Sequence, residues 1–347
     1  MTPNDLRSAV EVMLKSAQLD GEIDTLEILN GGKNNQTYKL VLRGGNRYVV
    51  KKYFQHAEDL RDRQNSEFLF STYAGKVCPN SVAKVYCQNQ SLKATLFEFI
   101  EGDAISPGGV DIMEINYAIN FINALNSLAF KSEATALPAA SEACFSVKEH
   151  LDLVESRVVA LHAAISEQLD QESSKFIDEL SRFWALLKGL IISEAKASSI
   201  DINSRLALGD RCISPSDFGF HNAIKDRHKN IRFIDFEYAG WDDPAKLVGD
   251  FFAQLAVPVP EKFSEKFIES IAPNFSDAQG FRVRAKLLMP VYQIKWCCIA
   301  LNVFLPAHLS RRQFSNRLLD VSILKAKQLA KAKILLTKLQ KKNYELH

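Results

Sequence analysis

The segment that most constrains this chain is SPSDFGFHNAIKDRHKNIRFIDFEYAG, residues 214–240. It contains Asp217, Asn222 five positions later, and Asp235 within the apolar run at residues 233–236. Carboxylates among large apolar side chains are costly to remove from water unless they are paired or bind a cation. The segment therefore predicts a site at which these polar side chains hold charge.

The composition is that of an ordinary globular protein. The 347 residues are enough for two domains or one two-lobed domain, and 47% are hydrophobic and 24% charged. A net charge of +2 gives no strong field for nucleic acid or a membrane surface. The first twenty residues lack a signal-peptide pattern, no apolar run reaches about 18 residues, and the six cysteines lack metal-type spacing. We therefore expect a reduced, cytoplasmic protein that binds neither nucleic acid nor membrane.

The N-terminal third predicts a sheet with one inserted helix. Residues 2–18 have the pattern of a capped amphipathic helix, and residues 58–75 that of a second helix. Five runs have the composition and alternation of strands: residues 23–29, 37–42, 47–54, 81–87 and 93–100. Their short connections predict an antiparallel five-stranded sheet interrupted by the second helix.

The rest of the chain is mostly helical in pattern, which makes the expected fold class α+β. Apolar residues recur at helical spacing in residues 112–130 and 176–192. In the second stretch the expected core face is Phe176, Leu180, Phe183, Leu187 and Leu190. The motif segment adds a short hairpin to this helical half. We expect a lobe over residues 1–101 and a helical lobe over residues 102–347, whose lysine-rich last helix has a solvated face.

The polar residues of the motif fit the needs of phosphoryl transfer. That reaction requires a carboxylate beside the attacking hydroxyl, oxygen ligands for Mg²⁺ and a cation on the phosphates. Asp217, Asn222 and Asp235 supply the carboxylates and the amide oxygen. Each residue alone is better explained by a structural role: a capped turn for Asp217, a strand start for Asn222 and a buried salt bridge for Asp235. The three together at this spacing favour a catalytic site.

The segment resembles the catalytic segment of the aminoglycoside phosphotransferase and choline kinase superfamily, a relative of protein kinases. That family has H-x-D-x-x-x-x-N and then a strand ending in I-D-[FW]-E, where this chain has P-S-D-F-G-F-H-N and FIDFEYAGWDDP. The resemblance implies a protein-kinase-like two-lobed fold, with Asp217 as catalytic base and Asn222 and Asp235 as Mg²⁺ ligands. Pro215 replaces the family's histidine, and Glu237 stands where protein kinases have glycine.

The N-terminal third resembles the nucleotide-binding lobe of the same family. In LNGGKNNQTYKL, Gly31 and Gly32 would let backbone amides approach phosphate oxygens. Lys51 follows Val49 by two positions and corresponds to the nucleotide-binding lysine. Glu67 corresponds to the helix glutamate that pairs with this lysine, with Glu58 as the alternative.

The segment TLFEFIEG resembles the hinge of that lobe, and it completes the expected nucleotide site. Phe97 corresponds to the gatekeeper, and the backbones of Glu98 and Ile100 to the groups that face adenine.

The resemblance implies a small-molecule kinase that uses ATP or GTP with Mg²⁺ to phosphorylate a hydroxyl of an aminoglycoside, an amino alcohol or a sugar. The alternative is a pseudokinase-like nucleotide-binding or scaffold protein, which Pro215 favours and the retained motif residues oppose. Acidic and aromatic candidates for a cationic acceptor are Trp241, Asp242, Asp243, Asp250, Tyr292 and Trp296. Basic candidates for an anionic or sugar acceptor are Lys286, Lys295, Arg311 and Arg312.

Overall fold

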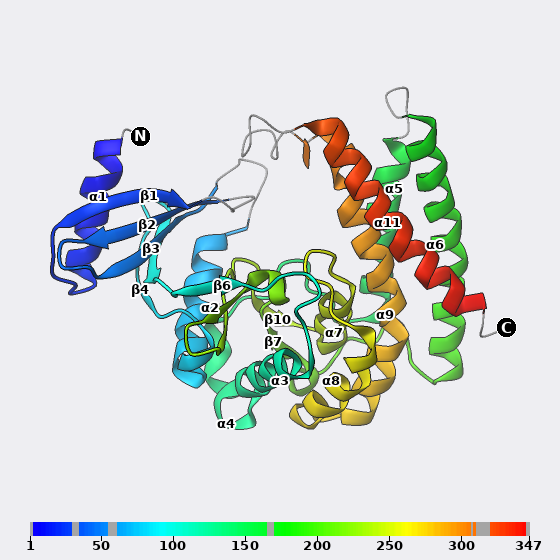
Figure 1. Cartoon of the computed structure of the whole chain (residues 1–347). Helices are drawn as coiled ribbons and strands as arrows, with labels where there is room; N and C mark the ends of the chain where they lie inside the picture. The colour runs from blue at the N-terminus through cyan, green and yellow to red at the C-terminus, as the bar shows by residue number, and fades with distance from the viewer. Residues whose placement is uncertain are drawn as a thin grey trace. The chain divides into compact units, whose positions relative to one another are not determined.

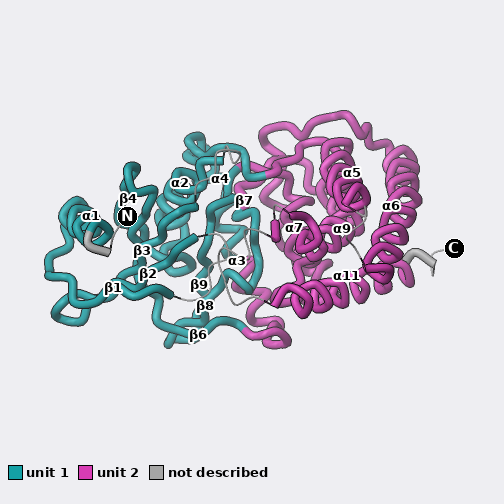
Figure 2. Tube along the Cα trace, turned by 90° about the horizontal axis from the view of Figure 1, so that it is seen from above, with its two compact units in different colours: residues 1–105, 120–141, 215–240 teal, residues 106–119, 142–214, 241–347 magenta. Residues whose placement is uncertain are grey.

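A computed structural model describes residues 3–29, 35–54, 61–164, 170–306, 308–309 and 320–344. The chain divides into two compact units (Figure 2). Unit 1 comprises residues 1–105, 120–141 and 215–240, and unit 2 comprises residues 106–119, 142–214 and 241–347. The motif segment from Pro215 onward therefore belongs to the same unit as the N-terminal sheet. The lobe boundary at residues 101 and 102 stays a prediction.

Unit 1 is built on a five-stranded antiparallel sheet with the strand order β1-β2-β3-β5-β4 (Figure 1). Its strands are β1 (Ile23–Leu29), β2 (Gln36–Leu42), β3 (Arg47–Lys52), β4 (Val85–Asn89) and β5 (Ala94–Glu98). The predicted sheet is confirmed. Strand β4 begins four residues later than expected, because residues 79–81 instead form a one-turn 3₁₀ helix that starts at Pro79.

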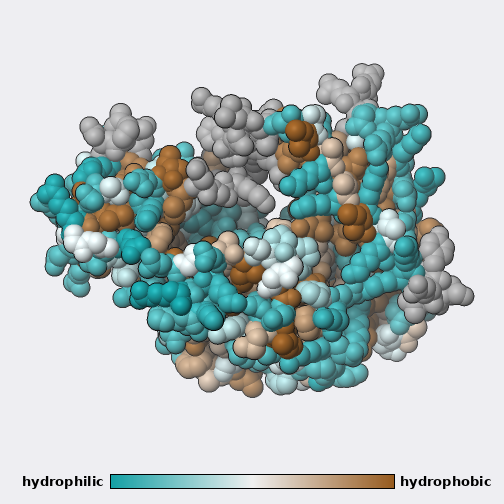
Figure 3. Space-filling model, viewed as in Figure 1, coloured by the Kyte–Doolittle hydropathy of each residue, from teal (hydrophilic) through white to brown (hydrophobic). Residues whose placement is uncertain are grey.

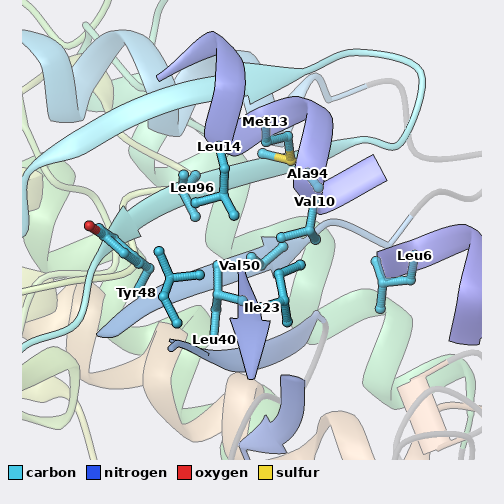
Figure 4. Packing of buried hydrophobic residues seen from close by; sticks show 11 residues of the cluster. Leu6, Val10, Met13, Leu14, Ile23, Leu40, Tyr48, Val50, Ala94 and Leu96 are labelled. Carbon is cyan, nitrogen blue, oxygen red and sulfur yellow. The ribbon is translucent and has the colours of Figure 1, made fainter. Parts of the chain in front are cut away.

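Helix α1 (Pro3–Ser16) packs its apolar face on this sheet (Figure 4). The spacing of Leu6, Val10, Met13 and Leu14 puts these side chains on one side of the helix. They form one hydrophobic cluster with residues of the sheet, namely Ile23, Leu40, Leu42, Tyr48, Val50, Ala94 and Leu96. Burial of this face gives the sheet a hydrophobic layer on one side and confirms the expected N-terminal helix.

Helix α2 (Arg63–Val77) follows β3 and begins where Asp62 caps it, accepting a hydrogen bond from the Asn65 amide. Phe70 and Tyr73 are buried, and the Tyr73 hydroxyl donates to the Leu125 carbonyl at 2.7 Å. The expected helix over residues 58–75 is thus displaced toward the C-terminus, and its first expected residues, 58–60, lie outside the described residues.

A second sheet of unit 1 carries the predicted hairpin. Its strands are β6 (Gly102–Ala104), β8 (Ala223–Asp226) and β9 (Ile231–Phe233), in the order β6-β8-β9. A Cβ on Gly102 would lie 2.3 Å from the Lys225 carbonyl oxygen, so glycine is needed for this close pairing. The β8–β9 hairpin is therefore fastened to the chain that leaves the first sheet.

Unit 2 is mostly helical, as predicted. Its main helices are α5 (Val147–Ala163), α6 (Gln171–Ala197), α7 (Pro244–Ala253), α8 (Ser264–Ile271), α9 (Ala278–Leu301) and α11 (Val321–Tyr344). Helix α3 (Ile112–Asn126) is divided between the two units, and helix α4 (Leu128–Lys131) belongs to unit 1. The short strands β7 (Cys212–Ser214) and β10 (Gly240–Asp242) pair with each other. The capping box of Ser146 and Glu149 starts α5.

The expected core face of α6 was wrong at two positions. Trp184 and Ile191 are buried, whereas Phe183 is only half-buried and Leu190 is exposed. Together with Leu180 and Leu187, the two buried residues follow steps of four, three and four, which is helical spacing like that of the predicted series, so the buried face differs from the prediction by one residue at these two positions.

Helix α9, with the turn that follows it, is the one segment of the described residues long and apolar enough to cross a membrane, and 72% of its most apolar window is buried in the protein. A buried helix of this kind is a core helix. The face drawn in Figure 3 is mostly hydrophilic, with hydrophobic residues in small separate patches. On α11, Ala332, Leu336 and Leu339 are buried while Lys341 and Lys342 are exposed, so its lysine-rich face is solvated as predicted.

Candidate active site

Lys51 lies at the centre of a buried charge cluster within unit 1. Its Nζ lies 2.6 Å from Oε2 of Glu67 on α2 and also makes an ion pair with Oδ1 of Asp235. Only 8% of Lys51 and 3% of Glu67 are exposed. Its neighbour Lys52 points to the other face of β3, since successive strand residues alternate. The structure thus brings together three of the predicted residues.

The electrostatics of this cluster keep Lys51 charged. Burial acts to lower its pKa, but Asp235, Glu67 and Glu237 outweigh that effect and raise the pKa well above its ordinary value. Burial raises the pKa of Glu67, against the opposing effect of Lys51. One ammonium group cannot neutralise both carboxylates that it contacts, so negative charge remains at Asp235, whose side chain is 40% exposed. A cation from solvent can reach that charge.

Glu67 connects the cluster to the motif segment through its two oxygens. Oε1 accepts a hydrogen bond from the Phe236 amide at 3.1 Å, next to Asp235. Oε2 accepts a second one from the buried hydroxyl of Tyr53 at 2.7 Å. Tyr53 was not predicted as a site residue. Its position two residues after Lys51 was a signal, because strand residues two apart share a face.

Asp235 leaves strand β9 with a backbone angle φ of +67°. Aspartate tolerates this left-handed region better than most residues, although it costs energy relative to glycine. The Ile234 amide donates to the Asn222 carbonyl at 2.9 Å, which fixes the end of the hairpin strand beside the loop from Asp217. Backbone contacts therefore hold Asp235 at its position, as is common for strained residues at functional sites.

The loop that carries Asp217 turns back on itself. The one-turn 3₁₀ helix η4 (Phe220–Asn222) returns His221 and Asn222 toward Asp217. Asn222 Nδ2 donates to the Asp217 carbonyl oxygen at 3.0 Å and lies 3.4 Å from its Oδ2. His221 Nε2 lies 3.2 Å from Asp217 Oδ1. The carboxylate of Asp217 is 38% exposed, so it is accessible to a substrate.

The donor set fits a hard cation such as Mg²⁺. The side-chain amide nitrogen of Asn222 donates a hydrogen bond to Asp217, so the side-chain amide oxygen of Asn222 points away from this contact. This oxygen and the exposed carboxylate of Asp235 are the ligand types that Mg²⁺ prefers, and Mg²⁺ needs few protein ligands because it keeps several waters. No group of three or more His, Cys, Asp or Glu side chains gathers as a metal site among the described residues, so any ion here would complete its shell with water or substrate.

Aromatic packing explains why these polar residues stand among phenylalanines. Phe121 stacks on Phe233 with ring centroids 4.7 Å apart, and Phe218 lies 5.0 Å from Phe233. Phe236 packs against Phe70 of α2 at 4.7 Å. Phe218, which follows Asp217, is buried, as are Phe233 and Phe236 on either side of Asp235. They anchor the motif segment, while the side chains of Asp217 and Asp235 stay 38% and 40% exposed.

Glu237 is buried and holds the segment that follows the predicted phosphate loop. Asn35 Nδ2 donates to Glu237 Oε2 at 2.6 Å, and Asn35 Oδ1 accepts from the Phe54 amide at 3.2 Å. Arg63 lies 3.7 Å from the other oxygen. Gly31 and Gly32 lie outside the described residues, as does the alternative Glu58, so their roles stay predictions.

The predicted hinge residues lie at the end of β5. Phe97 is buried on this strand, and the Glu98 side chain is held by Arg232, with contacts of 3.1 and 2.7 Å to its two oxygens. Both carboxylate oxygens of Glu98 therefore accept hydrogen bonds from an arginine of β9. Ile100 is buried, and the part of its backbone in binding a nucleotide base stays a prediction.

The predicted acceptor residues Asp242 and Asp243 lie in unit 2 and are fully buried. Asp242 pairs with Lys246 at 2.8 Å. Asp243 caps helix α7 and pairs with Arg284 at 2.6 Å and with His150 at 2.9 Å. Trp241 is half-buried beside them. These contacts give the two aspartates structural roles, and their part in binding an acceptor stays a prediction.

Of the other residues predicted as candidates for binding the acceptor, Asp250 is also buried in unit 2. Both of its oxygens lie 3.0 Å from Lys295 Nζ, and Trp296 Nε1 donates to it at 2.9 Å. Tyr292 is buried and its hydroxyl lies 2.5 Å from His150 Nδ1. Arg311 and Arg312 lie outside the described residues.

Comparison with solved structures identifies proteins of similar fold. No family model and no curated protein matches the chain. A choline/ethanolamine kinase family protein from Mesorhizobium loti matches with a TM-score of 0.56 and 16% identity, over 94% of this chain and 94% of that one. The gentamicin complex of APH(2")-IIa matches with a TM-score of 0.58 and 15% identity, over 96% of each chain.

A third match is spectinomycin phosphotransferase APH(9)-Ia in complex with ADP and spectinomycin, with a TM-score of 0.56 and 12% identity, over 95% of this chain and 98% of that one. At these identities the matches show the fold. They confirm the predicted protein-kinase-like α+β class and the predicted resemblance to choline kinases and aminoglycoside phosphotransferases.

Proposed function

We propose that the protein is a small-molecule kinase that transfers the γ-phosphoryl group of ATP or GTP to a hydroxyl group of an aminoglycoside, an amino alcohol or a sugar. The observation that carries the proposal is the contact of Lys51 with both Glu67 and Asp235. A lysine, a helix glutamate and a motif aspartate joined in this way are suited to hold the phosphates of a nucleotide.

The residues have distinct roles in the proposed reaction. Asp217 accepts the proton of the acceptor hydroxyl. At the same time the hydroxyl oxygen attacks the γ-phosphorus, and the bond between this phosphorus and the nucleoside diphosphate breaks. Lys51 neutralises phosphate oxygens of the donor, and the backbones of Glu98 and Ile100 face its base. Asp235 and Asn222 would hold Mg²⁺, which when bound neutralises charge on the phosphates.

The alternative is a pseudokinase-like protein that binds nucleotide without turnover, and Pro215 is the observation that favours it. A proline cannot donate the hydrogen bond of the family's histidine. Against it, Asp217, Asn222 and Asp235 are all present. Asn222 contacts Asp217, and its carbonyl accepts a hydrogen bond from Ile234, the residue before Asp235.

Two measurements on the full chain test the proposal. Millimolar MgATP or MgGTP should raise the melting temperature, since a ligand that binds the folded state stabilises it, and omission of magnesium should reduce the shift. Turnover should then be found in a panel of aminoglycosides, amino alcohols and free sugars. A shift without turnover of any acceptor would support the pseudokinase. The absence of a shift with both nucleotides would contradict every kinase-like function.

A further inference from the structure

The carboxylate of Asp217 has an imidazole beside it that the family resemblance does not account for. His221 Nε2 lies 3.2 Å from Asp217 Oδ1, four residues later in the chain. The side chain of His221 is 16% exposed, so most of the ring is covered by protein. The 3₁₀ turn η4 brings it there, since it reverses the chain between Gly219 and Asn222.

The environment of the second ring nitrogen indicates which nitrogen carries the proton. Nδ1 of His221 is buried and has no hydrogen-bond partner among the described residues. A proton on Nδ1 would be a buried donor without an acceptor, which is costly. Asp217 as a carboxylate only accepts hydrogen bonds. A proton on Nε2 therefore satisfies the contact, and His221 donates to Asp217 Oδ1.

The backbone before Asp217 makes such a contact useful. Ser216 has a φ of +65°, a left-handed conformation that serine rarely adopts. Pro215 precedes it, at the position where the family that the segment resembles has a histidine. The carboxylate of Asp217 follows this strained residue, and the side chains of Asn222 and His221 contact its two oxygens.

We propose that His221 is a positioning residue for Asp217, in which the Nε2–H of the imidazole orients the carboxylate from the C-terminal side of the loop. The inference rests on the function proposed above, because it assigns a role toward the same base. Donation to Oδ1 directs one oxygen toward the imidazole, and the other oxygen, which lies 3.4 Å from Asn222 Nδ2, faces the acceptor hydroxyl.

Two substitutions of His221 distinguish the effect of its N–H donor from the effect of its ring. His221→Leu removes the donor and keeps the apolar volume, whereas His221→Gln places an amide N–H near the position of Nε2. We expect kcat to fall on the order of tenfold to a hundredfold in His221→Leu, as for a slightly misplaced catalytic group. The KM for MgATP should stay within about twofold, because no donor contact is lost. His221→Gln should recover most of kcat.

His228→Leu is the matched control, because His228 is exposed on the turn of the β8–β9 hairpin. It should leave kcat unchanged. Equal kcat in wild type and His221→Leu would overturn the inference and leave the kinase function standing. Equal losses in His221→Leu and His221→Gln would also overturn it, since the ring and not its N–H would then matter.

A spectroscopic measurement tests the same contact without turnover. Long-range ¹H–¹⁵N spectra of the histidine rings of the full chain, with the His221 signals assigned by their absence from His221→Gln, should show the proton of the His221 ring on Nε2. A proton on Nδ1, or a ring that averages both tautomers, would overturn the inference. If no acceptor is phosphorylated by wild type, the proposed kinase function fails, and the ring spectrum still decides whether His221 donates to Asp217.

Discussion

Glu67 Oε1 accepts a hydrogen bond from the backbone amide of Phe236 at 3.1 Å. The helix glutamate therefore holds the residue next to Asp235 as well as the ammonium of Lys51. Asp235 has a left-handed backbone conformation, so this contact stabilises a strained position at the candidate metal site. Any loss of Glu67 orientation is expected to affect the lysine and the motif aspartate together.

The hydroxyl of Tyr53 is the first test of this coupling. Tyr53→Phe removes a buried donor to the Glu67 carboxylate, and hydrogen bonds to charged groups contribute about 1.5–3 kcal/mol. We expect the free energy of unfolding to fall by about that amount and the KM for MgATP to rise severalfold. Urea unfolding and steady-state kinetics measure the two effects. Tyr86→Phe, on a half-buried ring of β4 outside this network, should change neither.

The two lysines at the end of β3 test which face of the strand meets the nucleotide. Lys51→Met removes the cation that faces Glu67 and Asp235, and the loss of a preorganised charged group typically costs about a hundredfold or more in rate. Lys52→Met alters only the opposite face and should have little effect on kcat/KM for MgATP. Similar losses at the two positions would show that the assignment of the inner face is wrong.

The buried ion pairs of unit 2 predict a pH dependence of stability. Burial acts to raise the pKa of Asp250, but Lys295 and Lys246 lower it below its ordinary value. Because the folded-state pKa is depressed, this group stabilises the protein fully above the unfolded pKa of about 3.9, and the stabilisation is lost as pH falls below that value. Urea midpoints measured from pH 6 to pH 3 should fall steeply in wild type.

Asp250→Asn should lower the midpoint at pH 6 and flatten this decline. The lower midpoint arises because two buried lysines lose their carboxylate, a loss of about 3–5 kcal/mol for a broken buried pair. Asp152→Asn is the control, since Asp152 belongs to an exposed pair with Lys148, and it should leave the curve unchanged. A wild-type decline that persists in Asp250→Asn would assign the acid sensitivity to other groups.

The fold was predictable because its signals are local. The runs at residues 23–29 and 37–42 are strands in the structure, and the apolar face of α1 is buried, as predicted. On α6 the predicted and the observed series both have helical spacing, so the apolar pattern alone could not decide between Phe183 and Trp184 at adjacent positions.

The site was predictable only in part, because contacts between distant residues leave no spacing in the sequence. Lys51 and Glu67 were found by their order within a motif, and the structure joins them. His221 lies inside the same segment but was not predicted as a site residue. The sequence does not show that a 3₁₀ turn brings this residue, four positions after Asp217, back into contact with it. Asn35 and Glu237 are 202 residues apart, and neither sequence neighbourhood indicates the other.

The last prediction separates the enzyme from the pseudokinase. Asp217→Asn should reduce turnover on the order of 10²–10⁴-fold, the usual effect of removing a positioned general base. It should leave the magnesium-dependent thermal shift with ATP nearly intact, because Asp217 is not a proposed ligand. Asp235→Asn should weaken both, because the residue then lacks the charge that Lys51 and the metal ion share. Both replacements are nearly isosteric, so melting temperatures without nucleotide control for folding. If wild type and Asp217→Asn hydrolyse ATP at the same rate across the acceptor panel, the base assignment is wrong and the protein binds nucleotide without catalysing transfer.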